Sequence, residues 1–291
     1  MTAAEEKLKN ALTKIPRSAR EYPKELHSLS DAPEVLYAYG DVSLLRKRKF
    51  TVVGSRRTPA NILKLTESVV KELSDPFAIV TGSAEGGDSA AIEGGLQGSG
   101  KVICVLAGGF SALPQGNLDL LRRVAKKGLL ISPHPFETEV RAFSYEYRNK
   151  LLAALGEGAL ITAAGEKSGA LITAKYAKSF SKPIFAFPYP PGSATGAGCN
   201  GLLKSGEAMF TESANDVFER FGLDIKTRKK AIELTEIEHK AYDALQELGE
   251  GHLNELAMKS GLSVFKLRAT LSALEVKGLA VSLGGNRYAP V

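Results

Sequence analysis

Along the middle of the chain, runs of consecutive apolar residues alternate with segments whose apolar residues recur every three or four positions. The run at 101–109 (KVICVLAGG) is apolar almost throughout, as expected of a strand buried on both faces, and residues 61–73 show helical spacing. Further strands are predicted at 50–54, 77–82, 128–132, 159–165 and 183–188, and further helices at 89–97, 118–126, 142–155 and 170–180. This alternation is typical of an α/β fold with a doubly wound, mostly parallel sheet.

The same pattern divides the chain into four parts. Residues 1–45 form a short, polar lead-in, which we expect to pack on the main domain without being a domain of its own. Residues 46–222 form the α/β domain. Residues 223–234 (LDIKTRKKAIEL) are charged and poor in bulky apolar residues, which predicts a linker. Residues 235–291 form a compact C-terminal unit.

The C-terminal unit shows three helical segments followed by two strand-like segments around Gly284-Gly285-Asn286. Ser263 is placed to cap the third helix. Three helices followed by a hairpin predict a winged helix-turn-helix. The residues expected to face inward from its first helix are Ala241, Leu245 and Leu248.

Composition excludes several classes of protein. Hydrophobic residues make up 44% of the 291 residues, enough for a sizeable core. No apolar run reaches the roughly 18–20 residues of a membrane helix, and the charged start MTAAEEKLKN has no secretory apolar segment, so we expect a cytoplasmic protein. Cys104 in an apolar run and Cys199 in a predicted loop have no metal-ligand spacing, and no metal or disulfide is expected. The net charge of +6 is compatible with an anionic polymer as partner.

Four turns rich in glycine and serine are expected at the carboxyl ends of strands, where ligands bind in a doubly wound sheet. They lie at 54–57, 82–88, 108–109 and 166–169. The first and last carry Arg56, Arg57 and Lys167, and free backbone amides beside basic side chains suit phosphate oxygens. The sequence therefore predicts a phosphate or nucleotide-like site. There is no GxxxxGK[ST] loop, and no cofactor is expected.

Aromatic and basic side chains are interleaved between residues 141 and 150 (RAFSYEYRNK). Single-stranded nucleic acid is held by basic groups on its backbone and by aromatic faces that stack on its bases. Phe143 and Arg148 are therefore candidate contacts. Phe143 and Tyr147 are also spaced as core positions of a helix, and this alternative stays open.

Residues suited to acid–base catalysis are few. Asp88 and Glu93 lie about one turn apart on a predicted helix, and we expect Asp88 to cap that helix rather than transfer protons. The four histidines are far apart in the sequence and show no nucleophile pattern. No catalytic residue is predicted.

Six segments together resemble one protein family in order and spacing. They are VGSRR (53–57), TGSAEGGDSAAIEGGL (81–96), KVICVLAGG (101–109), YRNKLL (147–152), KSGALITAKYA (167–177) and GSATGAGCNGLLKSGEA (192–208). Over about residues 20–220 the chain resembles the DNA-processing protein A (DprA/Smf) family, and its C-terminal unit resembles the small end domain of that family.

The resemblance implies an extended Rossmann fold and a cytoplasmic, non-enzymatic homodimer. It implies that the protein binds and protects incoming single-stranded DNA and loads the RecA recombinase onto it during natural transformation. By position, the Arg148-Asn149 pair matches the RN motif of the family, which is structural as much as DNA-facing. With Phe143, the predicted DNA-binding residues are Gly54, Ser55, Arg56, Ser83, Arg148, Asn149, Ser168, Gly169 and Lys175.

The chain departs from the family pattern at several positions. Gly86-Gly87-Asp88 stands where the family has Gly-Ile-Asp, and Ile92 stands at the following histidine position. Tyr145-Glu146 replaces a Phe-Pro pair, and Pro188-Tyr189 replaces Pro-Gly. Most of the N-terminal helical domain of the family is missing. These differences concern the geometry of the site, and the chain is identified as a divergent member.

Two alternatives remain beside the DNA-binding hypothesis. A Rossmann-like enzyme acting on a nucleotide or phosphoribosyl compound would share the glycine-rich turns but needs a placed acid or base. The winged helix could read duplex DNA through Lys266, Arg268 and Arg287, but its many glutamates favour a protein contact. Apolar residues that could face either the core or a second copy are Phe185, Phe187, Met209 and Phe210.

Overall fold

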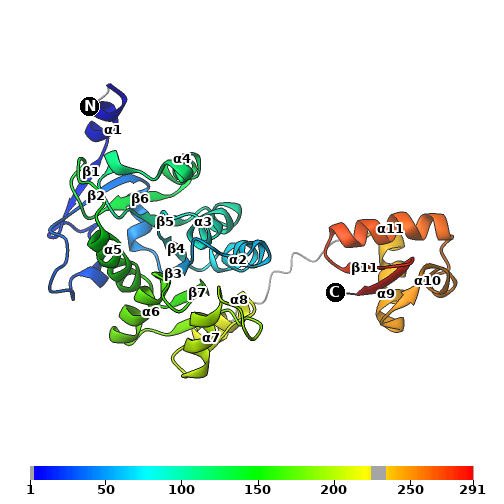
Figure 1. Ribbon diagram of the computed structural model, residues 1–291. Coiled ribbons are helices and arrows are strands. Elements are labelled where there is room, and N and C mark those ends of the chain that lie inside the picture. The colour runs from blue at the N-terminus through cyan, green and yellow to red at the C-terminus, as the bar shows by residue number, and fades with distance from the viewer. Residues whose placement is uncertain (1–2, 224–233, 291) are drawn as a thin grey trace. The chain divides into compact units, whose positions relative to one another are not determined.

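The computed structural model describes residues 3–223 and 234–290 of the chain (Figure 1). The chain divides into two compact units, Met1–Leu223 and Asp224–Val291. The predicted linker at 223–234 lies almost entirely outside the described residues, and each unit is described by itself.

A nine-stranded sheet runs through the described part of the first unit, in the order β1-β2-β6-β5-β4-β3-β7-β8-β9. From β6 to β9 in this order, neighbouring strands are parallel. The predicted doubly wound, mostly parallel sheet is confirmed. The strands are Thr13–Pro16 (β1), Val35–Gly40 (β2), Lys49–Gly54 (β3), Ala78–Thr81 (β4), Val102–Val105 (β5), Leu129–Ser132 (β6), Ala159–Ala163 (β7), Ile184–Ala186 (β8) and Met209–Phe210 (β9).

The N-terminal lead-in contributes two strands that were not predicted from its sequence. β2 pairs antiparallel with β6, and β1 pairs antiparallel with β2, so both extend the sheet at one edge. Along β2, Leu36 and Ala38 are buried, while Val35, Tyr37 and Tyr39 are only partly covered. This period of two is the signature of a strand with one face on the core.

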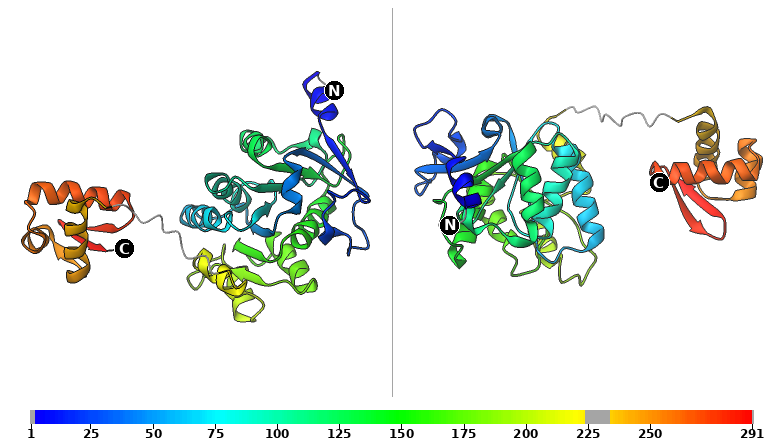
Figure 2. Two further views of the ribbon diagram at one scale, coloured as in Figure 1. Left: turned by 180° about the vertical axis from the view of Figure 1, so that it is seen from behind. Right: turned by 90° about the horizontal axis from the view of Figure 1, so that it is seen from above.

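Helices cover both faces of the sheet (Figures 1 and 2). α2 packs on α3 and α3 packs on α4 on one face, whereas α5 packs on α6 on the other. These helices span Ala60–Leu73 (α2), Gly87–Gln97 (α3), Leu118–Lys127 (α4), Ala142–Leu155 (α5) and Ala170–Ser179 (α6). Each follows a strand and crosses back over the sheet, as parallel pairing requires.

The strand order places a topological switch point between β3 and β7. From β3 the chain winds outward through β4 and β5 to β6, and then returns to form β7 on the opposite side of β3. The turns that follow β3 and β7 therefore diverge onto opposite faces, and a crevice opens between them at the carboxyl ends of the strands. Ligands bind at this point in open α/β sheets.

Glycine is required where the turn after β3 meets the start of α3. A Cβ atom built on Gly54 would lie 2.8 Å from the Cα of Gly87, closer than real contacts allow. Gly86 has a φ of +84°, which side chains other than glycine rarely adopt. The two backbones therefore touch, and they bring the turns after β3 and β4 together.

The prediction for Cys199 is wrong. Cys199 was expected in a loop, but it is buried within α7 (Ala197–Lys204) and its Sγ lies 3.6 Å from the carbonyl oxygen of Ile161. The segment is rich in glycine, which disguised its helical character. A last helix, α8 (Ala214–Arg220), begins with a capping box between Ser213 and Asp216.

The second unit has the predicted order of helices and hairpin. Its elements are α9 (Glu236–Leu248), β10 (Gly251–His252), α10 (Leu253–Ser260), α11 (Val264–Val276), β11 (Ala280–Gly284) and β12 (Arg287–Pro290). Ser263 caps α11 by accepting a hydrogen bond from the Lys266 amide, as predicted. Gly285 and Asn286 both have positive φ, as a tight hairpin turn requires. Leu248, expected to face inward, is 42% exposed at the end of α9.

Candidate functional site

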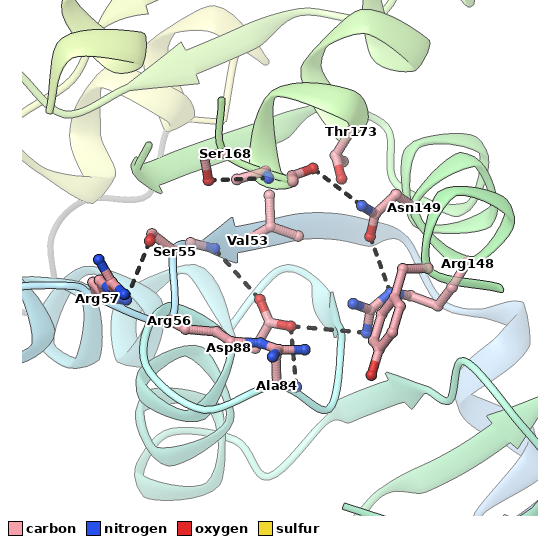
Figure 3. A pocket seen from close by; sticks show the side chains of 14 residues that line it. Val53, Ser55, Arg56, Arg57, Ala84, Asp88, Arg148, Asn149, Ser168 and Thr173 are labelled. Carbon is pink, nitrogen blue, oxygen red and sulfur yellow. Dashed lines mark hydrogen bonds and ion pairs between the residues drawn. The ribbon is translucent and has the colours of Figure 1, made fainter. Parts of the chain in front are cut away.

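A cavity of about 370 Å³ opens at the switch point between β3 and β7 (Figure 3). The turns after β3, β4 and β7 and one face of α5 contribute its lining. The polar and turn residues of the lining come from four segments. They are Gly54, Ser55, Arg56 and Arg57 after β3; Ala84 and Asp88 after β4; Tyr145, Arg148 and Asn149 on α5; and Ser168, Gly169 and Thr173 around the start of α6. Predicted phosphate-binding turns thus meet in one place.

Asp88 forms the floor of this cavity. Its carboxylate accepts hydrogen bonds from the backbone amides of Gly54 at 3.4 Å and Ala84 at 3.3 Å. Its Oδ2 lies 3.8 Å from Nη1 of Arg148, and both side chains are almost fully buried. The expectation that Asp88 caps α3 is wrong in detail, because Gly86 holds the N-cap position. Asp88 instead joins two turns to α5.

Arg148 and Asn149 extend this network to α6. Arg148 Nε donates to Asn149 Oδ1 at 3.0 Å, and Asn149 Nδ2 donates to the carbonyl of Gly169 at 3.0 Å. Burial raises the pKa of Asp88, while the nearby Arg148 guanidinium and two backbone amides act in the opposite direction. The Arg-Asn pair is therefore a structural part of the cavity wall as well as part of its lining.

The cavity is lined by two exposed arginines, Arg56 and Arg57, and Lys167 precedes the lining residue Ser168 in the chain. All three cations are exposed, and none has an ion-pair partner among the described residues. The guanidinium of Arg56 lies 5.5 Å from the ring centroid of Tyr145. Arg123, by contrast, is paired with Glu93 on α3. Unpaired arginines beside helix starts are free to bind phosphate oxygens.

Hydrogen-bond donors around the cavity are also available. Among the hydrogen bonds of the described residues, none is donated by the backbone amides of Arg56 or Gly169. The hydroxyl of Thr173 lines the cavity, and its oxygen is buried without a partner in that part of the chain. An anion in the cavity would satisfy such groups.

Other kinds of site find little support. Within residues 3–223 and 234–290, no group of three or more His, Cys, Asp or Glu side chains could hold a metal ion. In the same ranges, no helix has the length and apolar character needed to cross a membrane. Cys104 and Cys199 are both free and buried, and burial raises the pKa of each thiol.

Residues 13–222 match the family of DNA recombination-mediator protein A, and this match spans most of the chain. The chain belongs to this family. The resemblance seen in the sequence is thereby confirmed, and the second unit lies outside the matched region. The sequence left open a DNA-binding protein and a Rossmann-like enzyme. Because the family is one of recombination mediators, the comparison favours the non-enzymatic protein.

Two similar proteins agree with this placement. The DNA processing protein DprA of Bacillus subtilis is 36% identical over 208 residues, which are 70% of this chain and 70% of that protein. A putative DNA processing protein DprA of Mycobacterium tuberculosis is 34% identical over 260 residues, which are 86% of this chain and 67% of that protein.

Solved structures of the recombination-mediator family share the fold. DNA processing protein A from Streptococcus pneumoniae has a TM-score of 0.69 and 30% identity, covering 75% of this chain and 78% of that one. DNA processing protein A from Helicobacter pylori has a TM-score of 0.67 and 27% identity, covering 73% of this chain and 96% of that one. The structure of the latter protein is described for its single-stranded DNA binding mode.

The structure of this family member brings most of the predicted site residues together. Seven of them line the switch-point cavity: Gly54, Ser55, Arg56, Arg148, Asn149, Ser168 and Gly169. Ser83 lines an adjoining cavity. Phe143 is 63% exposed on α5, so its alternative assignment to the core is wrong, but it lines neither cavity. Lys175 is also exposed and lies outside both.

Several residues that line the cavity were missed as site residues, among them Tyr145, Asp88 and Thr173. Tyr145 lines it from α5, whereas Phe143 was chosen from the same run. Helical spacing could have corrected this choice, because Tyr145 lies three residues before Arg148 and four before Asn149 and so shares their face. Asp88 had been considered only as a cap or an acid, and no local pattern in the sequence pairs it with Arg148.

Proposed function

We propose that this protein binds single-stranded DNA by seating backbone phosphates in the switch-point cavity. The observation that carries the proposal is the pair of exposed arginines in the lining, Arg56 and Arg57, which have no ion-pair partner within the described residues. They lie beside the backbone amides of Arg56 and Gly169, which donate no hydrogen bond within the same residues. Such a site binds oxygens common to every nucleotide, so the binding is independent of sequence to a first approximation. A relative of similar fold is described for binding single-stranded DNA, which supports the proposal.

The strand is proposed to continue beyond the cavity on both sides. Phe143 offers an exposed aromatic face on α5 for base stacking, and Lys175 offers a cation on α6. Ser83 offers a hydroxyl in the adjoining cavity. If Lys175→Ala binds DNA as tightly as the wild type, the path does not follow α6.

Fluorescence anisotropy of labelled oligo-dT and of a matched duplex tests the proposal. We expect tight binding of the single strand that weakens steeply with salt, because each neutralised phosphate releases counterions, with a slope of about −0.7 per contact. The duplex is expected to bind more weakly, since a single strand can bend its backbone into the crevice. Equal binding of both, or binding insensitive to salt, would exclude the cavity as a phosphate seat.

We further propose that the protein acts as a cytoplasmic homodimer that protects incoming DNA and loads the RecA recombinase onto it during natural transformation. The family relationship supports this role. We expect RecA filaments to assemble faster on DNA that is coated with single-strand-binding protein. The rate of ATP hydrolysis by RecA measures this assembly. If the protein binds DNA but the rate of RecA filament assembly does not change, the protein binds single-stranded DNA without loading RecA.

A further inference from the structure

A second cavity of about 520 Å³ adjoins the switch-point cavity. Arg56, Ala84 and Tyr145 line both, so the two spaces are continuous along one side. The volume lies within the roughly 300–1,000 Å³ typical of small-molecule sites. A nucleotide whose phosphate occupied the first cavity would therefore have its sugar and base beside the second.

The walls of the second cavity suit the flat faces of a base. They are apolar and aromatic side chains of three segments: Leu106 and Ala107 after β5, Leu113 and Pro114 before α4, and Val140 and Tyr145 at the start of α5. Apolar and aromatic faces stabilise a desolvated base by stacking and van der Waals contact. Arg56, where the two cavities meet, supplies the positive charge of this lining.

Polar groups meet the cavity at one side. Ser83 is almost completely buried, yet its hydroxyl has no hydrogen-bond partner in residues 3–223 and 234–290. Glu85 and Gln115 also line the cavity, and the carboxylate of Glu85 packs directly against Gly116. Glu85 has no ion-pair or hydrogen-bond partner in the same residues. Glu85 is an exposed residue, so its carboxylate oxygens are open to a ligand that donates hydrogen bonds.

A carboxylate only accepts hydrogen bonds, and this limits which base it favours. Guanine carries two neighbouring donors on its Watson–Crick edge, the N1–H and the exocyclic amine, which fit the two oxygens of one carboxylate. Adenine and cytosine place an acceptor next to their amine, and thymine has its one donor between two carbonyls. An acceptor facing the carboxylate is repelled.

We propose that the second cavity takes one base of the DNA strand and selects guanine through Glu85. The inference rests on the proposed function, because the phosphate seat holds the strand beside the cavity. The phosphate contact in the switch-point cavity does not distinguish sequences. The base contact in the second cavity adds a moderate preference for guanine.

Competition between two labelled strands tests the selection. One is oligo-dT, and the other is the same strand with isolated guanines, which avoids guanine quadruplexes. The wild type is expected to bind the guanine-containing strand about fivefold tighter, the low end for one bidentate base contact. Inosine in place of guanine lacks the exocyclic amine and should lose most of this preference, whereas 7-deazaguanine keeps the same edge and should retain it.

The variant Glu85→Gln isolates the carboxylate, and Glu72→Gln, an exposed change on α2 that lines neither cavity, is its matched control. Removing a negative charge near the seat raises affinity for every strand, so the ratio between the two strands is the readout. Glu85→Gln should abolish the preference, and the control should keep it. Equal binding of both strands by the wild type, or a preference that survives in Glu85→Gln, overturns the base assignment while leaving DNA binding intact. Failure to bind either strand would overturn the proposed function and this inference together.

Discussion

Replacing Arg148 with methionine is expected to lower the free energy of unfolding of the first unit by about 3–5 kcal/mol near neutral pH. Arg148 is buried and its Nη1 lies 3.8 Å from Oδ2 of Asp88. Methionine fills similar space but leaves the Asp88 carboxyl buried without its counter-ion. The chain has no tryptophan, so urea unfolding followed by far-UV circular dichroism is the suitable measurement.

The destabilisation should depend on pH with a defined sign. Burial already raises the pKa of Asp88 in the folded protein, and loss of the Arg148 guanidinium removes a charge that opposes this rise. A carboxyl group with a raised folded pKa binds a proton on folding, so its contribution is most favourable below the unfolded pKa and is lost as pH rises through the folded value. The difference between Arg148→Met and the wild type should therefore shrink as the pH is lowered towards about 4, the ordinary range of an aspartate.

The double variant Asp88→Asn with Arg148→Met is the control for this mechanism. An asparagine at this position carries no charge, and its single amide oxygen can accept from one of the Gly54 and Ala84 amides, which the carboxylate binds through different oxygens. The double variant should regain much of the lost stability and show no extra dependence on pH. If single and double variants are equally unstable at every pH, the cost comes from packing and the ion pair contributes little.

Local signals explain how much of this fold the sequence revealed. The parallel strands are continuous apolar runs and the helices have clear periodicity, so both kinds of element were found, including the Ser263 cap. The antiparallel strands β1 and β2 were missed because most of the lead-in is polar, and because the pairing that stabilises them, β2 with β6 and β1 with β2, cannot be seen in the sequence. Cys199 was misplaced because glycine lowers helix propensity in α7, which tertiary packing overrides.

The candidate site also has parts that could be predicted from the sequence and parts that could not. Turns after buried strands can be recognised in the sequence, and the order of strands then brings them to one crevice. What the sequence could not supply is the direction of each side chain. Phe143 and Tyr145 are two residues apart on α5, and only Tyr145 faces the cavity. The pairing of Asp88 with Arg148 joins residues far apart in the sequence and depends on the completed fold.

Reversing the charge at Arg56 is expected to weaken binding of oligo-dT by about 30- to 100-fold at low salt. Arg56 lines both cavities and has no ion-pair partner among the described residues, so in the proposed complex a charge-assisted bond to phosphate is lost and a repulsive charge takes its place. The salt dependence should also become shallower, by about 0.7 in slope for each phosphate contact that disappears. Anisotropy titrations of Arg56→Glu across a salt series measure both effects.

The matched control is Arg220→Glu, which makes the same charge change at an exposed position on α8 that lines neither cavity. If binding depends on contacts in the crevice, this variant should keep most of the wild-type affinity and slope, because a distant exposed charge is screened within about a Debye length. Equal losses in both variants would mean that DNA responds to net charge alone. Wild-type binding by Arg56→Glu would move the phosphate seat away from the switch point, because no other exposed arginine lies at the junction of the two cavities within residues 3–223 and 234–290.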